Sequence, residues 1–85
     1  MKYRSRTDIV HLILEAANGG AATKSKIMYK AFLSFGQLKE YLMVLIENDL
    51  LEYEDGQNTY RTTSKGIRLL QIFNNMEELT PITLK

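Results

Sequence analysis

Two short helical patterns in the middle of the chain are separated by only two or three residues, and this connection constrains the fold most. Apolar residues recur at helical spacing over about 24–32 and again over 35–48, with Leu33 and Ser34 between them. A connection this short does not let the two helices lie antiparallel, so we expect them to cross at a steep angle. Ser34 and Gln37 match a capping box, which predicts a helix start near residue 35.

The apolar positions of these two patterns predict which side of each helix is buried. In the first helix of the pair we expect an inner side formed by Ile27, Met28, Ala31 and Phe32. In the second we expect it to consist of Leu38, Tyr41, Leu42, Leu45 and Ile46.

A β-hairpin is predicted directly after the second helix of the pair. Residues 51–54 alternate apolar and polar side chains, Asp55-Gly56 is a hairpin turn signal, and residues 59–62 return as a second strand. A two-stranded hairpin is marginally stable alone. We therefore expect its side with Leu51, Tyr53 and Tyr60 to pack on the helices.

Two further helices flank this central part. Apolar residues at helical spacing over 9–17 predict a first helix that ends at Asn18-Gly19-Gly20. Thr63 or Ser64 can start a last helix, which we expect to run to about Leu79 and to end before Pro81. The predicted order is helix, helix, helix, strand, strand, helix. It is a mainly α fold with a small β-hairpin, a winged helix-turn-helix, expected as one domain over 1–85.

Composition excludes several classes of protein. There is no cysteine and only one histidine, which excludes a disulfide scaffold and most zinc and histidine-based catalytic sites. No apolar run is long enough to span a membrane. No nucleophile–base pair or glycine-rich phosphate loop is evident. We expect no enzymatic activity, cofactor, metal ion, membrane partner or small-molecule ligand, and a cytoplasmic, nucleoid-associated protein.

Charge is unevenly distributed along a chain whose net charge is only +1. Residues 1–39 carry seven basic and two acidic side chains, whereas residues 40–60 carry six acidic side chains and no basic one. This polarity indicates a basic face directed at a polyanion, and accidental clustering on a solvated surface is the equal alternative.

The second helix of the central pair, over 35–48, is the candidate recognition helix for double-stranded DNA. Its N-terminal residues are placed to reach bases in the major groove, and the preceding helix is placed to cross the phosphates. Glu40 and Glu47 on its outer face favour insertion of only the first turn. The alternatives are that Ser34 and Gln37 only cap the helix and that the lysines are solvated. The candidate DNA-binding residues are Lys24, Lys26, Tyr29, Lys30, Ser34, Phe35, Gly36, Gln37, Lys39 and Arg61.

The last helix has more apolar surface than a small core can cover. One line of side chains would remain in water in a monomer, which indicates a partner. The alternative is that both apolar lines of this helix are buried within one chain. We expect a two-fold homodimer in which residues 64–79 form the dimerisation helix. The candidate interface residues are Val10, Leu14, Leu69, Ile72, Phe73, Met76 and Leu79.

Two stretches resemble a known family. They are residues 23–34 (TKSKIMYKAFLS), with Gln37-Leu38 and Tyr41-Leu42, and residues 62–66 (TTSKG). They are similar to the small archaeal winged-helix DNA-binding proteins, which include chromatin-associated proteins and transcription regulators. Over roughly residues 5–79, the resemblance implies DNA binding through the third helix, homodimerisation and an archaeal or archaeal-virus source. A last helix of about fifteen residues is shorter than in the family's longer members and predicts a short helix-pair interface.

A winged helix can also serve as a protein–protein interaction module, because a fold does not fix a function. The acidic side chains of the third helix and of the hairpin favour this alternative. A continuous basic patch of Lys24, Lys26, Lys39 and Arg61 would favour DNA, whereas intervening Glu40, Glu47 and Glu54 would favour a protein partner.

Overall fold

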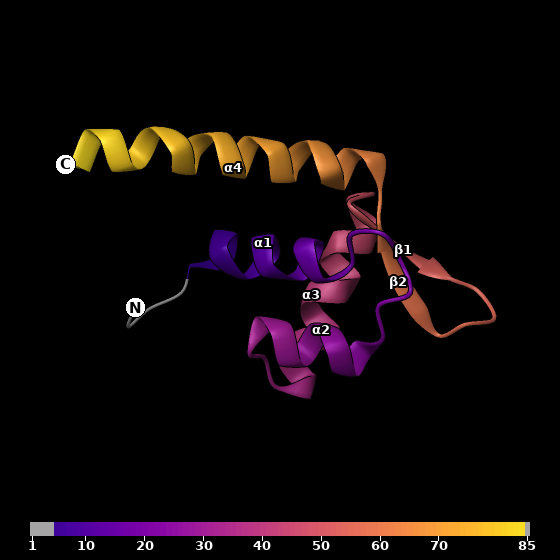
Figure 1. Ribbon diagram of the computed structural model, residues 1–85. Helices are drawn as coiled ribbons and strands as arrows, with labels where there is room; N and C mark the ends of the chain where they lie inside the picture. The colour runs from indigo at the N-terminus through magenta and orange to yellow at the C-terminus, as the bar shows by residue number, and fades with distance from the viewer. Residues whose placement is uncertain (1–4, 85) are drawn as a thin grey trace.

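The structure, a computed structural model, describes the backbone of residues 5–84 and the side chains of residues 5–75. Its elements follow the predicted order (Figure 1): α1 Arg6–Ala16, α2 Lys24–Ala31, α3 Phe35–Glu47, β1 Leu51–Glu54, β2 Thr59–Thr62 and α4 Ser64–Leu84. The predicted winged helix-turn-helix architecture is therefore confirmed.

Helix α1 lies at the centre of the molecule. Helices α2 and α3 lie on one side of it, and α4 runs along the other side in the opposite direction (Figure 1). The largest fully buried side chains come from three helices and the hairpin, so one core joins these elements. They are Ile13, Leu14, Ile27, Leu38 and Leu51.

The turn between α2 and α3 differs from the prediction in the side chain that it buries. Phe32 has a left-handed backbone conformation, with φ of 55°, and its side chain is 74% exposed. The N–H of Leu33 donates to the carbonyl of Met28 at 3.0 Å, and Leu33 is buried. This is the Schellman pattern, in which the residue after the left-handed position packs back on the helix. Phe32 is therefore not on the inner side of α2.

The hairpin pairs Leu51 with Thr62 and Tyr53 with Tyr60 in an antiparallel register. Leu51 and Tyr60 are buried as predicted, but Tyr53 is exposed. Its ring packs edge-on against the Tyr60 ring at 5.2 Å, and its hydroxyl donates to Asn58 Oδ1 at 2.5 Å. Tyr53 thus covers Tyr60 from the solvent side.

The segment between α1 and α2 adds a bridge to the outer edge of β2. Ala22 and Tyr60 exchange two backbone hydrogen bonds, at 2.8 Å and 3.2 Å. The pattern of apolar residues gave no sign of this bridge, because it involves one residue. It ties the base of the hairpin to the start of the helix-turn-helix.

Helix α4 is longer than predicted. It continues through Pro81 to Leu84 and has 21 residues, or about 31 Å at 1.5 Å per residue. A proline removes one N–H and strains the preceding turn, but it does not oblige a helix to end. In Figure 1 the yellow end of α4 extends beyond the start of α1.

Candidate nucleic-acid interface

The start of α3 is held by the predicted capping box. Ser34 Oγ accepts from the N–H of Gln37 at 3.2 Å, and Gln37 Oε1 accepts from the N–H of Ser34 at 3.0 Å. Bidentate pairing of glutamine with adenine needs the side-chain oxygen and the NH₂ group together. While the box is intact, Gln37 has its NH₂ group for a ligand but not the Oε1–NH₂ pair, so bidentate contact with adenine does not fit this geometry.

Two lysines from different helices flank the exposed ring of Phe35. Lys24 Nζ, from the first turn of α2, lies 6.0 Å from the ring centroid, and Lys39 Nζ, from α3, lies 5.9 Å from it. These distances are at the outer limit of cation–π attraction. We call Lys24, Phe35 and Lys39 the Phe35 cluster. It brings three predicted site residues together at the helix-turn-helix.

The backbone at the start of α3 is open to approach. A Cβ atom built on Gly36 would have no atom of the described structure within 4 Å, so packing does not require glycine there. The N–H groups of the first helical turn and the helix dipole favour an anion at this position.

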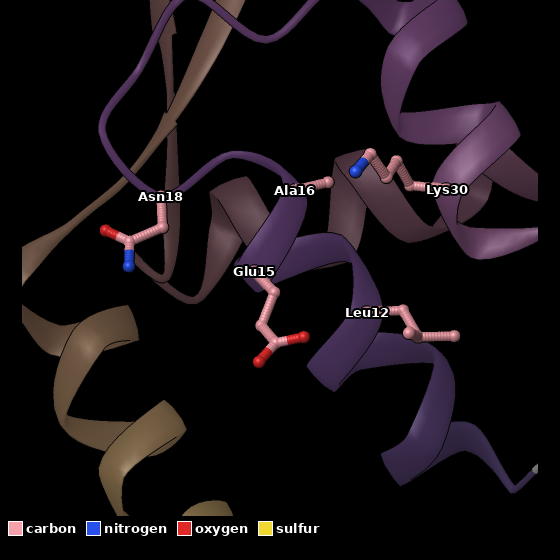
Figure 2. Close-up of a pocket in the computed structure, with 5 residues that line it drawn as sticks. All are labelled: Leu12, Glu15, Ala16, Asn18 and Lys30. Atoms are coloured by element: carbon pink, nitrogen blue, oxygen red, sulfur yellow. The ribbon is translucent and has the colours of Figure 1, made fainter.

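The other α2 candidates spread around the helix. Lys26 and Tyr29 are exposed. Lys30 points toward the end of α1 and lines a shallow hollow of about 350 Å³ with Leu12, Glu15, Ala16 and Asn18 (Figure 2). The structure therefore places Lys30 beside α1 rather than in the Phe35 cluster.

Arg61 is engaged within the hairpin. Its Nε and Nη2 donate to Glu54 Oε2 at 3.2 Å and 2.9 Å, and Glu52 Oε2 lies 3.8 Å from Nε. Two charge-assisted hydrogen bonds to one carboxylate oxygen hold the guanidinium in place. Among the described residues, the ion-pair partners of Arg61 are these two carboxylates, so its charge is balanced within the hairpin and not shared with the Phe35 cluster.

Glu54 is the centre of a hydrogen-bond network between the hairpin and the segment after α1. Its Oε1 accepts from the hydroxyl of Thr59 at 2.6 Å and from the N–H of Ala21 at 2.8 Å. These two bonds, that of Thr59 first, hold the pKa of the Glu54 carboxyl below its ordinary value of 4.5. Burial opposes them, and the hydrogen bond and charge of Arg61 add smaller lowering effects. Glu54 is thus ionised at neutral pH and forms part of the structure of the wing.

The predicted dimer residues have different surroundings. Leu14 is 0% exposed and belongs to the core, so its prediction as an interface residue is wrong. It was misplaced because α1 is covered on two sides, by α2 and by α4. Val10, Leu69 and Phe73 are partly buried against the core. Phe73 packs on the His11 ring at 5.4 Å between ring centroids.

Ile72 differs from these residues because it is 53% exposed on α4. Met76 and Leu79 lie outside the residues whose side chains the structure describes. Leu69, Ile72, Met76 and Leu79 nevertheless recur on α4 at intervals of three, four and three residues, the spacing of a coiled-coil seam.

Apolar side chains are also exposed in the second half of α3, and for Val44 and Ile46 this exposure was not predicted from the sequence. Met43, Val44 and Ile46 are exposed. Ile46 was expected to face inward, but it lies at the edge of the buried face formed by Leu38, Leu42 and Leu45. The sequence contained one sign of this exposure, because α3 has more apolar residues than one face of a helix can bury.

No group of three or more metal-ligating side chains occurs in the part of the chain that the structure describes. No helix in this part is both long enough and apolar enough to cross a membrane.

Comparison with known proteins identifies the fold family. A sequence model described as winged helix-turn-helix matches residues 3–81, nearly the whole chain. The chain belongs to the winged helix-turn-helix family. Within this family's architecture, α2 and α3 are the helix-turn-helix and the β1–β2 hairpin is the wing.

Two similar proteins come from archaea, as the resemblance implied. The uncharacterized protein MJ0290 of Methanocaldococcus jannaschii is 34% identical over 68 residues, which are 80% of this chain and 31% of that protein. The chain thus spans about a third of the length of this relative. The crystal structure of Sso10a-2, a DNA-binding protein from Sulfolobus solfataricus, superposes with a TM-score of 0.75 at 19% identity. The match covers 95% of this winged helix-turn-helix chain and 86% of Sso10a-2. The resemblance to small archaeal winged helix-turn-helix proteins is therefore confirmed.

Proposed function

We propose that this protein binds double-stranded DNA as a homodimer, through the start of α3, and acts as a transcription regulator or chromatin-associated protein. The observation that carries the proposal is the Phe35 cluster, in which two lysines from different helices flank an exposed ring at the helix-turn-helix. The description of Sso10a-2 as a DNA-binding protein with the same fold supports it.

In this proposal the first turn of α3 enters the major groove. Lys24 and Lys39 neutralise phosphates beside the groove, and Lys26 extends the basic surface along α2. The open backbone at Gly36 lets a phosphate approach the N–H groups of the first turn. Glu40 and Glu47, further along α3, keep the rest of the helix out of the groove by repulsion.

The wing lies away from the duplex in this arrangement. Arg61, its basic residue on β2, is paired with Glu54 and Glu52, and Asp55 adds a further negative charge at the turn. Bringing this acidic hairpin to phosphate would cost electrostatic free energy and would compete with the ion pairs of Arg61.

Measuring DNA affinity against salt concentration tests the proposal. The logarithm of the association constant should fall linearly with the logarithm of salt, with a slope of about 0.9 per phosphate contact. In Lys24→Gln and Lys39→Gln variants, binding should weaken and the slope should decrease by about one for each lysine and protomer. The readout is fluorescence anisotropy of a labelled duplex.

Lys65→Gln is the matched control, because Lys65 Nζ donates to the carbonyl of Asn48 at 3.0 Å and is outside the Phe35 cluster. Its salt slope should equal that of the unmodified protein. Absence of binding to any duplex at low salt would contradict DNA binding, and equal slopes in all three variants would contradict the assigned surface.

A second candidate function, a protein–protein interaction module, is favoured by the exposed Met43, Val44 and Ile46 on α3. An apolar face of this kind is typical of a surface that docks another protein. Val44→Ser separates the two functions. It should leave DNA affinity unchanged if α3 contacts DNA only by its first turn. If no duplex binds and Val44→Ser abolishes binding to a protein partner, the interaction module is the function.

The homodimer is proposed from α4. Its yellow end extends beyond α1 (Figure 1), Ile72 is exposed, and the residues at 69, 72, 76 and 79 have coiled-coil spacing. Two copies of α4 packed along this line would cover the exposed side chains and present two helix-turn-helix units to successive half-sites.

A further inference from the structure

The start of α3 offers unusually little hydrogen-bonding capacity for reading bases. Ser34 Oγ and Gln37 Oε1 are occupied by the capping box, which leaves Gln37 with its NH₂ group alone, and Gly36 has no side chain. The side chain that projects from this turn is Phe35, which is 54% exposed. If this turn enters the major groove, the group best placed to meet the base edges is therefore a phenyl ring.

We infer that Phe35 recognises the C5-methyl group of thymine. This inference rests on the proposed binding of duplex DNA by α3. In the major groove, thymine is the base with an apolar feature, a methyl group, and an apolar side chain in contact with it favours that base. The ligand chemistry assigned to Phe35 is thus a methylated pyrimidine in a duplex.

The lysines of the Phe35 cluster support this placement of the ring. Lys24 Nζ, from α2, lies 6.0 Å from the centroid of the Phe35 ring, and Lys39 Nζ, from the second turn of α3, lies 5.9 Å from it. Each lysine can reach a phosphate while the ring faces the bases between them. The charge fixes the class of ligand as a polyanion, and the ring supplies a preference among bases that the lysines cannot supply.

A duplex in which deoxyuridine replaces thymidine tests the inference directly. The replacement removes the methyl group and keeps the O4 acceptor and the base pairing. The protein should bind the thymidine duplex about fourfold more tightly for each methyl in contact, the factor expected from burying one methyl-sized group. A G·C duplex should gain affinity when its cytosines carry a 5-methyl group, which occupies the same groove.

Variants connect this preference to Phe35. Phe35→Ala should reduce the ratio of thymidine to deoxyuridine affinity to one, and Phe35→Leu should retain most of it, because leucine keeps an apolar contact. Met43→Ala, which shortens another exposed apolar side chain of α3, should leave the ratio unchanged. Lys39→Gln should lower affinity for both duplexes equally, so that charge and methyl recognition separate.

The outcomes distinguish this inference from the proposed function. Salt-dependent binding with equal affinity for thymidine and deoxyuridine duplexes would overturn methyl recognition and leave DNA binding standing. A ratio that persists in Phe35→Ala would also overturn it, since the preference would then come from DNA shape. Tighter binding of the single strand than of the duplex, lost in Phe35→Ala, would assign the ring to base stacking instead. No binding of any duplex would refute both proposals.

Discussion

Gly66, in the first turn of α4, has no room for a side chain. A Cβ atom built there would collide with the carbonyl oxygen of Leu50 and would lie 2.5 Å from Thr62 Cγ2. The N–H of Gly66 also donates to Thr63 Oγ1, the cap of α4, at 3.0 Å. Close approach of the start of α4 to the Leu50 backbone, in the connection between α3 and β1, therefore requires glycine at this position.

We predict that Gly66→Ala lowers the free energy of unfolding by about 3 kcal/mol, the upper part of the usual range for overpacking. Urea denaturation measures this change. Gly36→Ala is the control with the opposite sign. It has open space and a helical backbone, so it should raise the free energy of unfolding by about 0.5 kcal/mol. Equal stability of the two variants would contradict the packing of α4 described here.

Glu54 gives a prediction for the pH dependence of stability. The pKa of the Glu54 carboxyl is lower in the folded protein than its ordinary value of 4.5. Its contribution to the free energy of unfolding is therefore complete above pH 4.5. The contribution is lost as the pH falls through the lower pKa of the folded state. The melting temperature should therefore fall as the pH drops below about 4.5, and it should fall less in Glu54→Gln.

Glu52→Gln is the control for this measurement. Glu52 is exposed and lies 3.8 Å from Arg61, so its removal should leave the pH profile of melting close to that of the unmodified protein. If Glu54→Gln and Glu52→Gln had the same profile, the network of Glu54 with Ala21 and Thr59 would not be the cause.

Helices and strands were predictable where one periodicity dominates, and helix ends were predictable where a side chain caps them. Ser34 fixes the start of α3, as expected. Two ends were not predictable in this way. Phe32 adopts a left-handed conformation that normally favours glycine. Its aromatic side chain had suggested a place on the inner side of α2, and the left-handed backbone turns it away from that side. Pro81 indicated an end that α4 does not have, because a helix can continue through a proline.

Helix α4 carries the prediction for oligomeric state. Ile72→Glu should convert a dimer to a monomer, because it places a charge in the proposed apolar seam. Ile67→Glu is the matched control: Ile67 is 38% exposed but lies off the line of 69, 72, 76 and 79, so this variant should stay dimeric. Sedimentation at micromolar concentration is the measurement. A monomeric unmodified protein, or a dimeric Ile72→Glu variant, would contradict the interface.

For the whole molecule, the architecture followed from the order of periodic segments and the short connection between α2 and α3. The surroundings of single residues did not, because they depend on contacts between distant segments. Lys24 meets Phe35 only once α2 and α3 cross, and Arg61 meets Glu54 only in the actual hairpin register. The position of Leu14 in the apolar pattern of α1 does not distinguish it from an exposed residue. Leu14 is buried because α1 packs between α2 and α4.

The reciprocal cap of Ser34 and Gln37 separates the residues that hold the start of α3 from the exposed residues beside them. Positions 35, 36, 39 and 40 are exposed and carry none of the capping bonds. Substitutions at these four positions should therefore leave the stability of α3 largely unchanged. The exposed surface at the start of α3 can thus vary in sequence while the capped framework beneath it is inherited intact.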